Sequence, residues 1–560
     1  MRNRVFLLFF LSVLGTPAQD YLRPHAEYLN APRFPEGAYF RRHFSVQAPR
    51  IELQAPAKLA DFVADGKLEL SLRSYLELVL ANNTDIQIQK LSVETQRNAI
   101  TRAFAPFDPV VTASFRSTRQ VTQSQTALEG AQTAQNLTQP LTFTYQQTLD
   151  SGMTYNIGFG GTKTSTNSAF ATFNPALTAN MNFSFTQPLL RNRGRAVNKI
   201  QIMVARSRLR GAEYNMQDQL LRLLQTAENA YWGLVESREA LGVQEQALNL
   251  ADVQLKRALR ELELGVIPDL DIYLPQQNYA NQQIFVTQAR YRLAQSEDVL
   301  RRQMGADLDP QFRGMPIALT ETVLPPADES AIDKEAMVEL ALRQRPDLKS
   351  VLQNLDIDDL NFRQTKNTLL PDLSLSANYL STGRGGPFVG RTNVFTGDGT
   401  RSEIVSRVPG GLADALDQVF GFNFPVYGFA LTLRLPIRDR RAAADLADVT
   451  VSKRLNTLRA RNVEQLIRQD VVNAVTQVES SRASIKLAQT SLEFSQKRVD
   501  AEDKKYNLGV TTIFFVLEAQ NALTRSQADL VTQSVQYRRN LLNLLRVTGQ
   551  LLEERGVYAP

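Results

Sequence analysis

The sequence predicts a mainly helical protein with membrane-type β-strands, built as two repeats of helix, strand, strand and helical hairpin. Three observations support this fold class. Segments 244 residues apart match each other, apolar residues recur at a spacing of seven, and several short segments alternate between apolar and polar residues. The chain has 560 residues, more than one ordinary domain usually holds.

The internal repeat is clearest at two short motifs. Leu264-Gly265-Val266 matches Leu508-Gly509-Val510, and the offset holds without a gap as far as Gly305 and Gly549. Upstream, residues 76–86 resemble residues 338–348. A fixed offset of this kind indicates two copies of one structural unit. We place the first repeat at 70–305, a proline-containing linker at 306–330, and the second repeat at 331–549.

The ends of the chain lie outside the repeats. Residues 1–18 combine Arg2 and Arg4, a short apolar stretch and small residues, which predicts a secretory signal peptide. Residues 19–69 are expected to form an irregular, proline-rich leader, and residues 550–560 a C-terminal tail. After the N-terminus no stretch of about 18 apolar residues occurs, so no transmembrane helix is expected.

Apolar residues seven apart predict long paired helices that follow each Leu-Gly-Val motif. They are Ile272, Tyr279, Val286, Leu293 and Leu300 in the first copy and Val516, Leu523, Leu530, Tyr537 and Leu544 in the second. This period gives a left-handed coiled-coil seam. Each motif is then the turn of an antiparallel hairpin, because glycine accepts positive φ. The expected helices are 71–104, 196–263 and 270–305, then 331–369, 440–507 and 513–548.

Period-two alternation predicts two strands in each copy, at about 109–122 and 178–189, and at 372–381 and 422–436. One apolar and one small or polar face suits a wall between lipid and a watery lumen. A half-buried soluble sheet shows the same alternation. The signal peptide, the absence of cysteine and the long hairpins favour the membrane β-barrel. Four strands cannot enclose a pore, so several chains must contribute.

The first copy contains an additional β-hairpin at 140–164, which turns at Asp150-Ser151-Gly152. The pattern leaves two positions open for it, either above the membrane or in the barrel. In the second copy, the glycine-rich residues 381–420 are expected to form a long extracellular loop.

Composition excludes several function classes. The chain has no cysteine, hence neither disulfides nor a cysteine-linked acyl anchor. It has only two histidines and no recognisable catalytic or phosphate-binding motif, so we expect no enzyme activity, no metal site and no cofactor. The net charge of +6 is spread over a long chain and does not indicate nucleic-acid binding.

The order of these elements resembles the TolC family of bacterial outer-membrane efflux proteins. Besides the two Leu-Gly-Val motifs, the matching segments are residues 345–348 (RPDL), 369–373 (LLPDL) and 186–191 (TQPLLR). The resemblance implies an outer-membrane homotrimer that shares a twelve-stranded barrel in contact with lipid and extends a helical tunnel into the periplasm. Such a channel binds a periplasmic adaptor, meets an inner-membrane pump indirectly, and exports small molecules, metals or proteins. The alternative is a periplasmic coiled-coil adaptor or structural protein without a barrel.

The resemblance also implies functional residues at the tips. The hydrophobic-Gly-hydrophobic residues expected to meet the adaptor are Leu264, Gly265, Val266, Leu508, Gly509 and Val510. The family narrows its tunnel with acidic residues six and nine positions after the second tip glycine, and here these positions hold Phe515 and Glu518. The phenylalanine departs from the pattern, which favours a mixed aromatic and carboxylate constriction. Asp271 is the corresponding acid of the first copy. We expect the second tip to line the constriction and the first to lie outside it.

Overall fold

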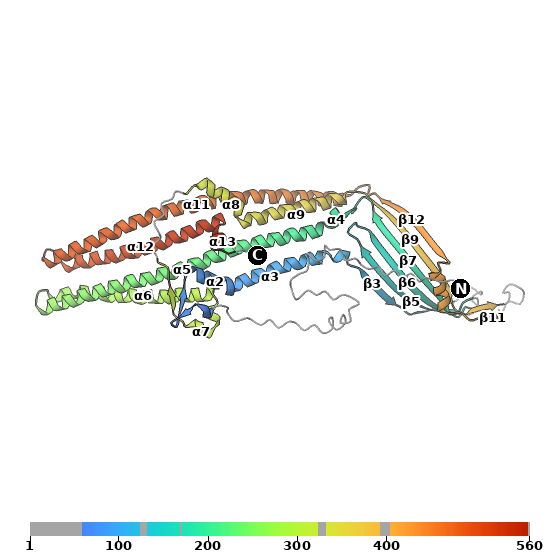
Figure 1. The fold of residues 1–560 in the computed structure, drawn as a ribbon, viewed down its shortest axis with the longest axis horizontal. Coiled ribbons are helices and arrows are strands. Elements are labelled where there is room, and N and C mark those ends of the chain that lie inside the picture. Colours follow the sequence, from blue (N-terminus) through green and yellow to red (C-terminus); the bar gives the residue numbers. More distant parts are fainter. Residues whose placement is uncertain (1–58, 124–131, 169–170, 323–331, 392–403, 558–560) are drawn as a thin grey trace. The chain divides into compact units, whose positions relative to one another are not determined.

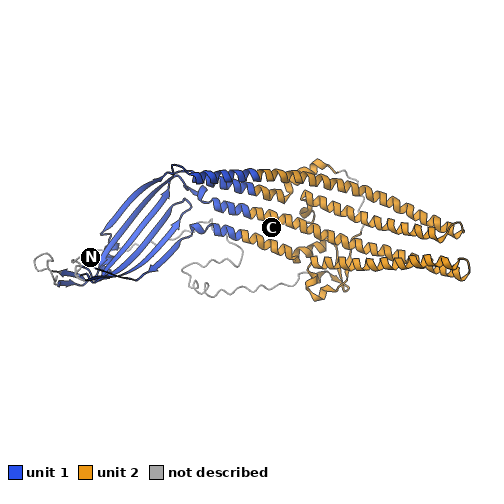
Figure 2. Ribbon diagram, turned by 180° about the vertical axis from the view of Figure 1, so that it is seen from behind, with its two compact units in different colours: residues 1–22, 97–208, 354–455 blue, residues 23–96, 209–353, 456–560 orange. Residues whose placement is uncertain are grey.

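The computed structural model describes residues 59–123, 132–168, 171–322, 332–391 and 404–557, so the expected signal peptide lies outside the described residues. The chain forms two compact units, and each unit contains parts of both repeats (Figure 2). The first unit comprises residues 1–22, 97–208 and 354–455, and the second comprises the remainder. Among the described helices, none is both long and apolar enough to cross a membrane.

The first unit is dominated by a seven-stranded antiparallel sheet (Figure 1). Its strands are β3 (Val110–Phe115), β4 (Thr118–Gln123), β5 (Thr133–Thr148), β6 (Thr154–Thr166), β7 (Ala176–Pro188), β9 (Asp372–Gly385) and β12 (Pro425–Arg434). The order across the sheet is β12-β9-β7-β6-β5-β3, and β4 also pairs with β5. The strands of the second repeat are therefore neighbours, whereas β3 and β7 of the first repeat are separated by β5 and β6.

The observed strands differ from the expected ones at two places. The strand expected at 109–122 is divided into β3 and β4, which lie one after the other along β5. The additional hairpin is longer than 140–164 and forms the middle of the sheet. Its alternation predicted which residues share a face, but alternation cannot identify the neighbouring strand.

The segment expected as a loop at 381–420 contains regular structure. Its described parts include the end of β9, the hairpin of β10 (Phe388–Arg391) with β11 (Ile404–Val408), and helix α10 (Leu412–Phe420). A Cβ atom at Gly383 or Gly385 would overlap the backbone of the α10 segment, so glycine is required for this close approach. Ala415 and Val419 of α10 pack there against Ala179.

Two helical hairpins follow the strands. The first consists of α5 (Ile200–Glu263) and α6 (Tyr273–Gln303), and the second of α11 (Arg440–Asn507) and α12 (Ile513–Thr548). The first return helix starts three residues later than expected, because the short helix η5 (Asp269–Ile272) follows Pro268. Many seam residues are buried, including Val286, Leu300 and Val516. The short helices η3 (Ala105–Phe107) and α4 (Arg195–Asn198) lie beside strand ends.

The helices expected at 71–104 and 331–369 are each broken at equivalent positions. The first consists of α2 (Leu72–Asn82) and α3 (Thr84–Ala103), and the second of α8 (Lys334–Gln344) and α9 (Pro346–Thr368). Asn83 and Arg345 at the breaks have extended backbone angles. Pro346 explains the second break, since a residue before proline avoids the helical region.

A glycine after each returning helix packs against these breaks. Gly305 and Gly549 have φ values of +72° and +80°. A Cβ on Gly305 would lie 3.3 Å from the Cβ of Asn82, and one on Gly549 would lie 3.2 Å from the Cβ of Gln344. Each repeat therefore has the same joint, where the C-terminal glycine meets a broken helix.

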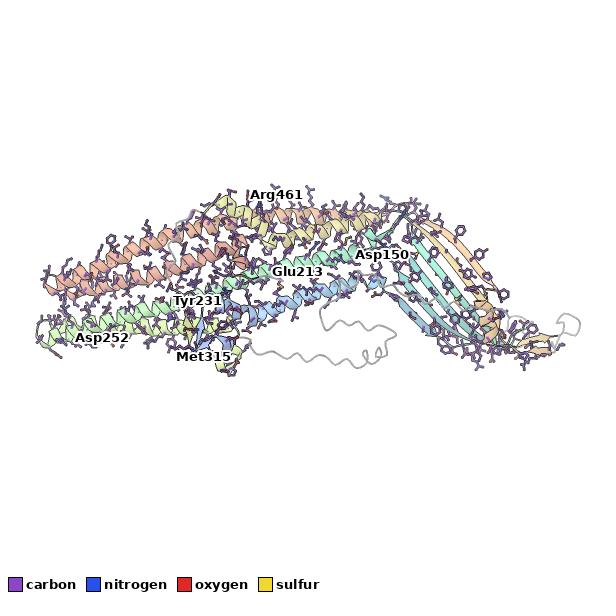
Figure 3. The ribbon with its side chains drawn as sticks, in the orientation of Figure 1. Asp150, Glu213, Tyr231, Asp252, Met315 and Arg461 are labelled. Atoms are coloured by element: carbon purple, nitrogen blue, oxygen red, sulfur yellow. The ribbon has the colours of Figure 1, made fainter. Side chains whose placement is uncertain are left out.

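The leader, the linker and the C-terminal tail contain regular structure, whereas the leader was expected to be irregular. The described residues form η2 (Leu59–Phe62), β1 (Val63–Ala64), β2 (Lys67–Leu70), η6 (Ala306–Leu308), α7 (Pro310–Arg313), β8 (Ile317–Leu319) and α13 (Leu551–Glu554). Strand β2 pairs in parallel with β8. Leu68 and Leu70 are buried beside Tyr231, which is labelled in Figure 3, and this burial explains the order.

The repeated joints predict different effects for three glycine substitutions. Gly305→Ala and Gly549→Ala should each destabilise the protein by about 1–2 kcal/mol, because alanine is strained at positive φ. Gly242→Ala is the matched control, since Gly242 lies inside α5 and a Cβ there meets nothing within 4 Å. This control should be neutral or slightly stabilising.

The single tryptophan, Trp232, is buried in the second unit and reports unfolding by its fluorescence. Equal unfolding temperatures for Gly549→Ala and Gly242→Ala would contradict the assignment of the joint.

Candidate functional site at the hairpin tips

Both Leu-Gly-Val motifs end a long helix with the same backbone arrangement. Gly265 and Gly509 have φ values of +68° and +71°. The Val266 amide donates to the Glu261 carbonyl at 2.8 Å, and the Gly265 amide to the Leu262 carbonyl at 2.9 Å. The second tip repeats this pattern, with Val510 donating to Lys505 and Gly509 to Tyr506. This is the Schellman arrangement, in which glycine satisfies the last carbonyls of a helix.

The apolar residues of both tips are exposed. The exposed fractions are 72% for Leu264, 69% for Val266, 78% for Leu508 and 74% for Val510. A Cβ at either tip glycine would meet nothing within 4 Å. Four exposed aliphatic side chains on two rigid turns are unusual for a surface that contacts only water, and clustered exposed apolar residues mark binding sites.

The two tips differ after the glycine. In the first, Pro268 precedes η5, and Asp269 and Asp271 stand in its first turn. In the second, Thr512 takes the place of the proline and α12 begins directly at Ile513. The sequence difference between the repeats therefore changes the local backbone as well as the charge.

The expected constriction residues lie near the start of the returning helices. Phe515 is 47% exposed and its ring stands edge-on to that of Phe514, with 5.4 Å between centroids. Glu518 forms an ion pair with Arg498 of the preceding helix at 3.5 Å, and both side chains are about half exposed. Asp271 is exposed on the other hairpin. The carboxylate of Glu518 is therefore partly compensated within its own hairpin.

A polar network that the sequence did not predict joins the two hairpins just behind the tips. Arg257 of α5 donates to Asn507 of α11 at 2.6 Å and to Glu261 at 2.9 Å. The Tyr506 hydroxyl donates to Glu261 at 2.7 Å, and the Arg257 guanidinium lies 4.7 Å from the centre of the Tyr506 ring. Asp503 adds an ion pair to Arg257 at 3.7 Å.

One sequence signal could have located this network. Tyr506 occupies a coiled-coil seam position at which the first repeat has Leu262. A tyrosine in an apolar seam indicates a nearby polar partner, because a buried hydroxyl requires a hydrogen bond. A second connection joins the returning helices, where Gln282 of α6 donates to Asn521 of α12 at 3.1 Å.

The surroundings of Tyr506 alter its acidity. Partial burial, followed by the hydrogen bond to Glu261 and the charge of that carboxylate, raises the pKa of Tyr506 to about 12. The charge of Asp271 acts in the same direction and that of Arg257 in the opposite direction. The neutral phenol is thus favoured in the folded protein.

The described residues contain no group of three or more histidine, aspartate or glutamate side chains that could hold a metal ion. The arrangement at the tips is suited to binding through apolar side chains and to holding two hairpins together.

Comparison with known proteins relates the chain to outer-membrane channels. Residues 337–550 match the family described as outer membrane efflux protein. The outer membrane protein TolC of Escherichia coli K12 is 22% identical over 337 residues, which cover 60% of this chain and 63% of TolC. The match thus spans less than two thirds of that relative.

Solved structures share the fold at low sequence identity. CusC has a TM-score of 0.61 at 14% identity, covering 89% of this chain and 95% of CusC. VceC of Vibrio cholerae has a TM-score of 0.59 at 14% identity, covering 85% of this chain and 96% of VceC. At this identity the likenesses show the fold, and the match of residues 337–550 confirms the resemblance stated from the sequence.

The environment of Tyr506 predicts a pH effect. An ordinary tyrosine has a pKa of about 10. Because folding raises the pKa of Tyr506, its contribution to stability is complete below pH 10 and is lost as the pH rises towards about 12. Ultraviolet titration should therefore show one phenol of high pKa fewer in Tyr506→Phe. Burial also raises the pKa of Tyr75 and of Tyr231, so these two phenols remain in the variant.

The matched control is Tyr291→Phe, because Tyr291 of α6 is 70% exposed. It should leave the number of high-pKa phenols unchanged. An unchanged number of high-pKa phenols in Tyr506→Phe would contradict the assignment to Tyr506.

Proposed function

We propose that the chain is a member of the TolC family of bacterial outer-membrane efflux proteins and forms the channel and periplasmic exit duct of a tripartite export system. Its location is the outer membrane, with helices in the periplasm, and it is not an enzyme. The proposal rests on one observation. The same chain contains a sheet with one apolar and one polar face, and two helical hairpins with exposed apolar tips. In this role it passes small molecules, metals or proteins received from an inner-membrane pump.

The sheet supports a membrane wall formed by several copies. Tyr427, Phe429, Leu431 and Leu433 share one face of β12 and are each at least 60% exposed. Strands β12 and β3 are the two edges of the sheet, and their outer backbone groups lack strand partners among the described residues. In lipid such groups must be paired, which only closure with further copies achieves. The family resemblance gives three copies.

The tips are the proposed docking surface for a periplasmic adaptor. Leu264, Val266, Leu508 and Val510 present their side chains on turns whose backbone groups are already satisfied. Rigid turns lose little conformational freedom on binding, so apolar contact contributes directly to affinity. The partner is therefore a protein with an apolar surface, and the pump is reached through it.

The second tip is the proposed constriction. Three copies of Phe515 and Glu518 around one axis combine an apolar ring, which excludes water, with carboxylates that attract cations. Arg498 beside each Glu518 reduces the net charge of that ring. Asp271 supplies an acid on the neighbouring hairpin, and the network of Arg257, Glu261 and Tyr506 holds the hairpins of each chain together.

If the tips bind an adaptor, substitutions at the tips should reduce export without preventing oligomer formation. Leu508→Asp/Val510→Asp and Leu264→Asp/Val266→Asp should each reduce export at least tenfold, because charged groups cannot enter an apolar interface without a partner. The variants are tested in the native host after deletion of the chromosomal copy. Oligomer formation and channel conductance should be unchanged.

The control is Leu487→Asp, which changes an equally exposed leucine (70%) of α11 away from the tip. Normal export by both tip variants would reject the docking surface, whereas a loss with Leu487→Asp as well would show a general effect on the helix.

The channel and its constriction are tested together in planar bilayers. Protein extracted from membranes with detergent should conduct ions, and Phe515→Ala/Glu518→Ala should increase the conductance. Glu518→Gln alone should reduce the preference for cations over anions. Glu493→Gln is the control, since Glu493 is an exposed α11 carboxylate paired with Lys497.

Unchanged conductance in the double variant would reject these residues as the constriction. A protein that is soluble without detergent and conducts nothing would instead support a periplasmic adaptor.

A further inference from the structure

The β5–β6 hairpin occupies a place in the sheet that the two-repeat plan does not require. Strand β9 pairs directly with β12 in the second repeat, over ten residue pairs. In the first repeat, β6 pairs with β7 over eleven residue pairs and β3 pairs with β5 over six. The hairpin is therefore inserted between the two strands expected from the repeat (Figure 1).

The faces of the inserted strands match those of their neighbours. One row of directly opposed residues crosses the sheet from edge to edge and is entirely apolar or aromatic. It consists of Tyr427, Tyr379, Phe183, Ile157, Tyr145 and Val111. A strand placed outside the wall would have no reason to keep this register, because a slip of one residue exchanges the faces.

The opposite face of the hairpin is small, polar and uncharged. It carries Thr142, Thr144 and Gln146 on β5 and Asn156, Gly158 and Gly160 on β6. Strand β7 continues the face with Asn180, Asn182, Ser184 and Thr186. A water-facing wall accommodates such residues, whereas the exposed Leu141 and Phe143 of the other face would meet water if the hairpin entered a lumen.

Strands β6 and β7 pack through glycines that lie opposite asparagine side chains. A Cβ on Gly158 would overlap the side-chain oxygen of the opposite Asn182, and one on Gly160 would lie 3.0 Å from that of Asn180. The same arrangement occurs between β12 and β9, where a Cβ on Gly428 would lie 3.3 Å from the side-chain oxygen of Asn378. The inserted hairpin thus uses the cross-strand packing of the regular strands.

The turn of the hairpin is also attached to the start of the following helix. Asp150, which is labelled in Figure 3, forms ion pairs with Lys199 at 2.9 Å and with Arg195 at 3.1 Å. The hydrogen bond from Lys199, and then the charges of both cations, lower the pKa of Asp150 despite partial desolvation. The Gly194 amide donates to the Ser151 carbonyl at 3.0 Å. These contacts hold the turn at the end of the sheet that leads into α5.

We propose that the hairpin is part of the membrane wall, so that each chain contributes six strands across the barrel and a trimer closes eighteen. The number of copies rests on the proposed function, whereas the six strands rest on the pairing described above. The partner at each edge is a second copy of this chain. The β3–β4 edge follows β5 from Thr133 to Gln146, and the ten residues of β12 can pair along this length.

A wall of this size changes the channel mouth. Barrel diameter grows roughly linearly with strand number, so eighteen strands give about one and a half times the diameter of twelve. The lumen faces of β5, β6 and β7 carry no charged residue. The opening of the barrel is then wide and uncharged on these strands. Cargo would therefore be selected at the helical end of the protein.

Engineered disulfides test the position of the hairpin in the assembled protein. The chain contains no cysteine, so an introduced pair supplies its only thiols. Ile157→Cys/Phe183→Cys joins directly opposed residues of β6 and β7 and should cross-link within one chain. Val111→Cys/Phe183→Cys places thiols in the same row but three strand spacings apart, about 14 Å. A disulfide cannot span this distance, so this pair should not cross-link within one chain.

Native mass spectrometry and electron microscopy of the same samples give the number of copies and the barrel width. Three copies, a 157–183 cross-link and no 111–183 cross-link are expected. A 111–183 cross-link in a conducting trimer would overturn the inserted wall and leave the channel function intact. Two copies with the 157–183 cross-link would overturn the count of eighteen, and a non-conducting protein would overturn the proposed function itself.

Discussion

The rest of the structure depends on the two-faced character of the sheet. Apolar side chains such as Phe143, Phe183 and Tyr427 share one face, and small uncharged residues share the other. A surface of this kind suits the boundary between an apolar and an aqueous medium, which the proposed membrane wall provides. The apolar face therefore determines where the strands reside, and the helices that continue from β7 and β12 must begin at the watery end of those strands.

The two repeats of the chain have the same joints but different tips. Gly305 and Gly549 meet broken helices in the same way, because both repeats need a left-handed residue where a returning helix ends. After Gly265 and Gly509, in contrast, one copy has Pro268 with two aspartates and the other has Phe514 and Phe515. Similar backbones thus present different chemistry, which allows the two hairpins of one chain to take different roles.

The sequence predicted features that depend on local periodicity. Helices α11 and α12 have the expected bounds, since the seven-residue seam runs through them without a proline. The break at Arg345 could have been predicted from Pro346, but the break at Asn83 has no such signal. The place of the β5–β6 hairpin was not predictable, because alternation assigns faces and not neighbours. The network around Tyr506 was missed because long side chains from distant segments meet only after folding.

The two edges of the sheet lack strand partners among the described residues, and this has a consequence for biogenesis. If the strands form the proposed membrane wall, a single chain cannot enter the bilayer at low cost, since the outer backbone groups of β12 and β3 would then meet hydrocarbon without a hydrogen-bonding partner. Insertion must therefore follow or accompany the meeting of the chains, and its rate should depend steeply on the concentration of newly exported protein. The helical hairpins have no such requirement, so folding in the aqueous compartment can precede the membrane step.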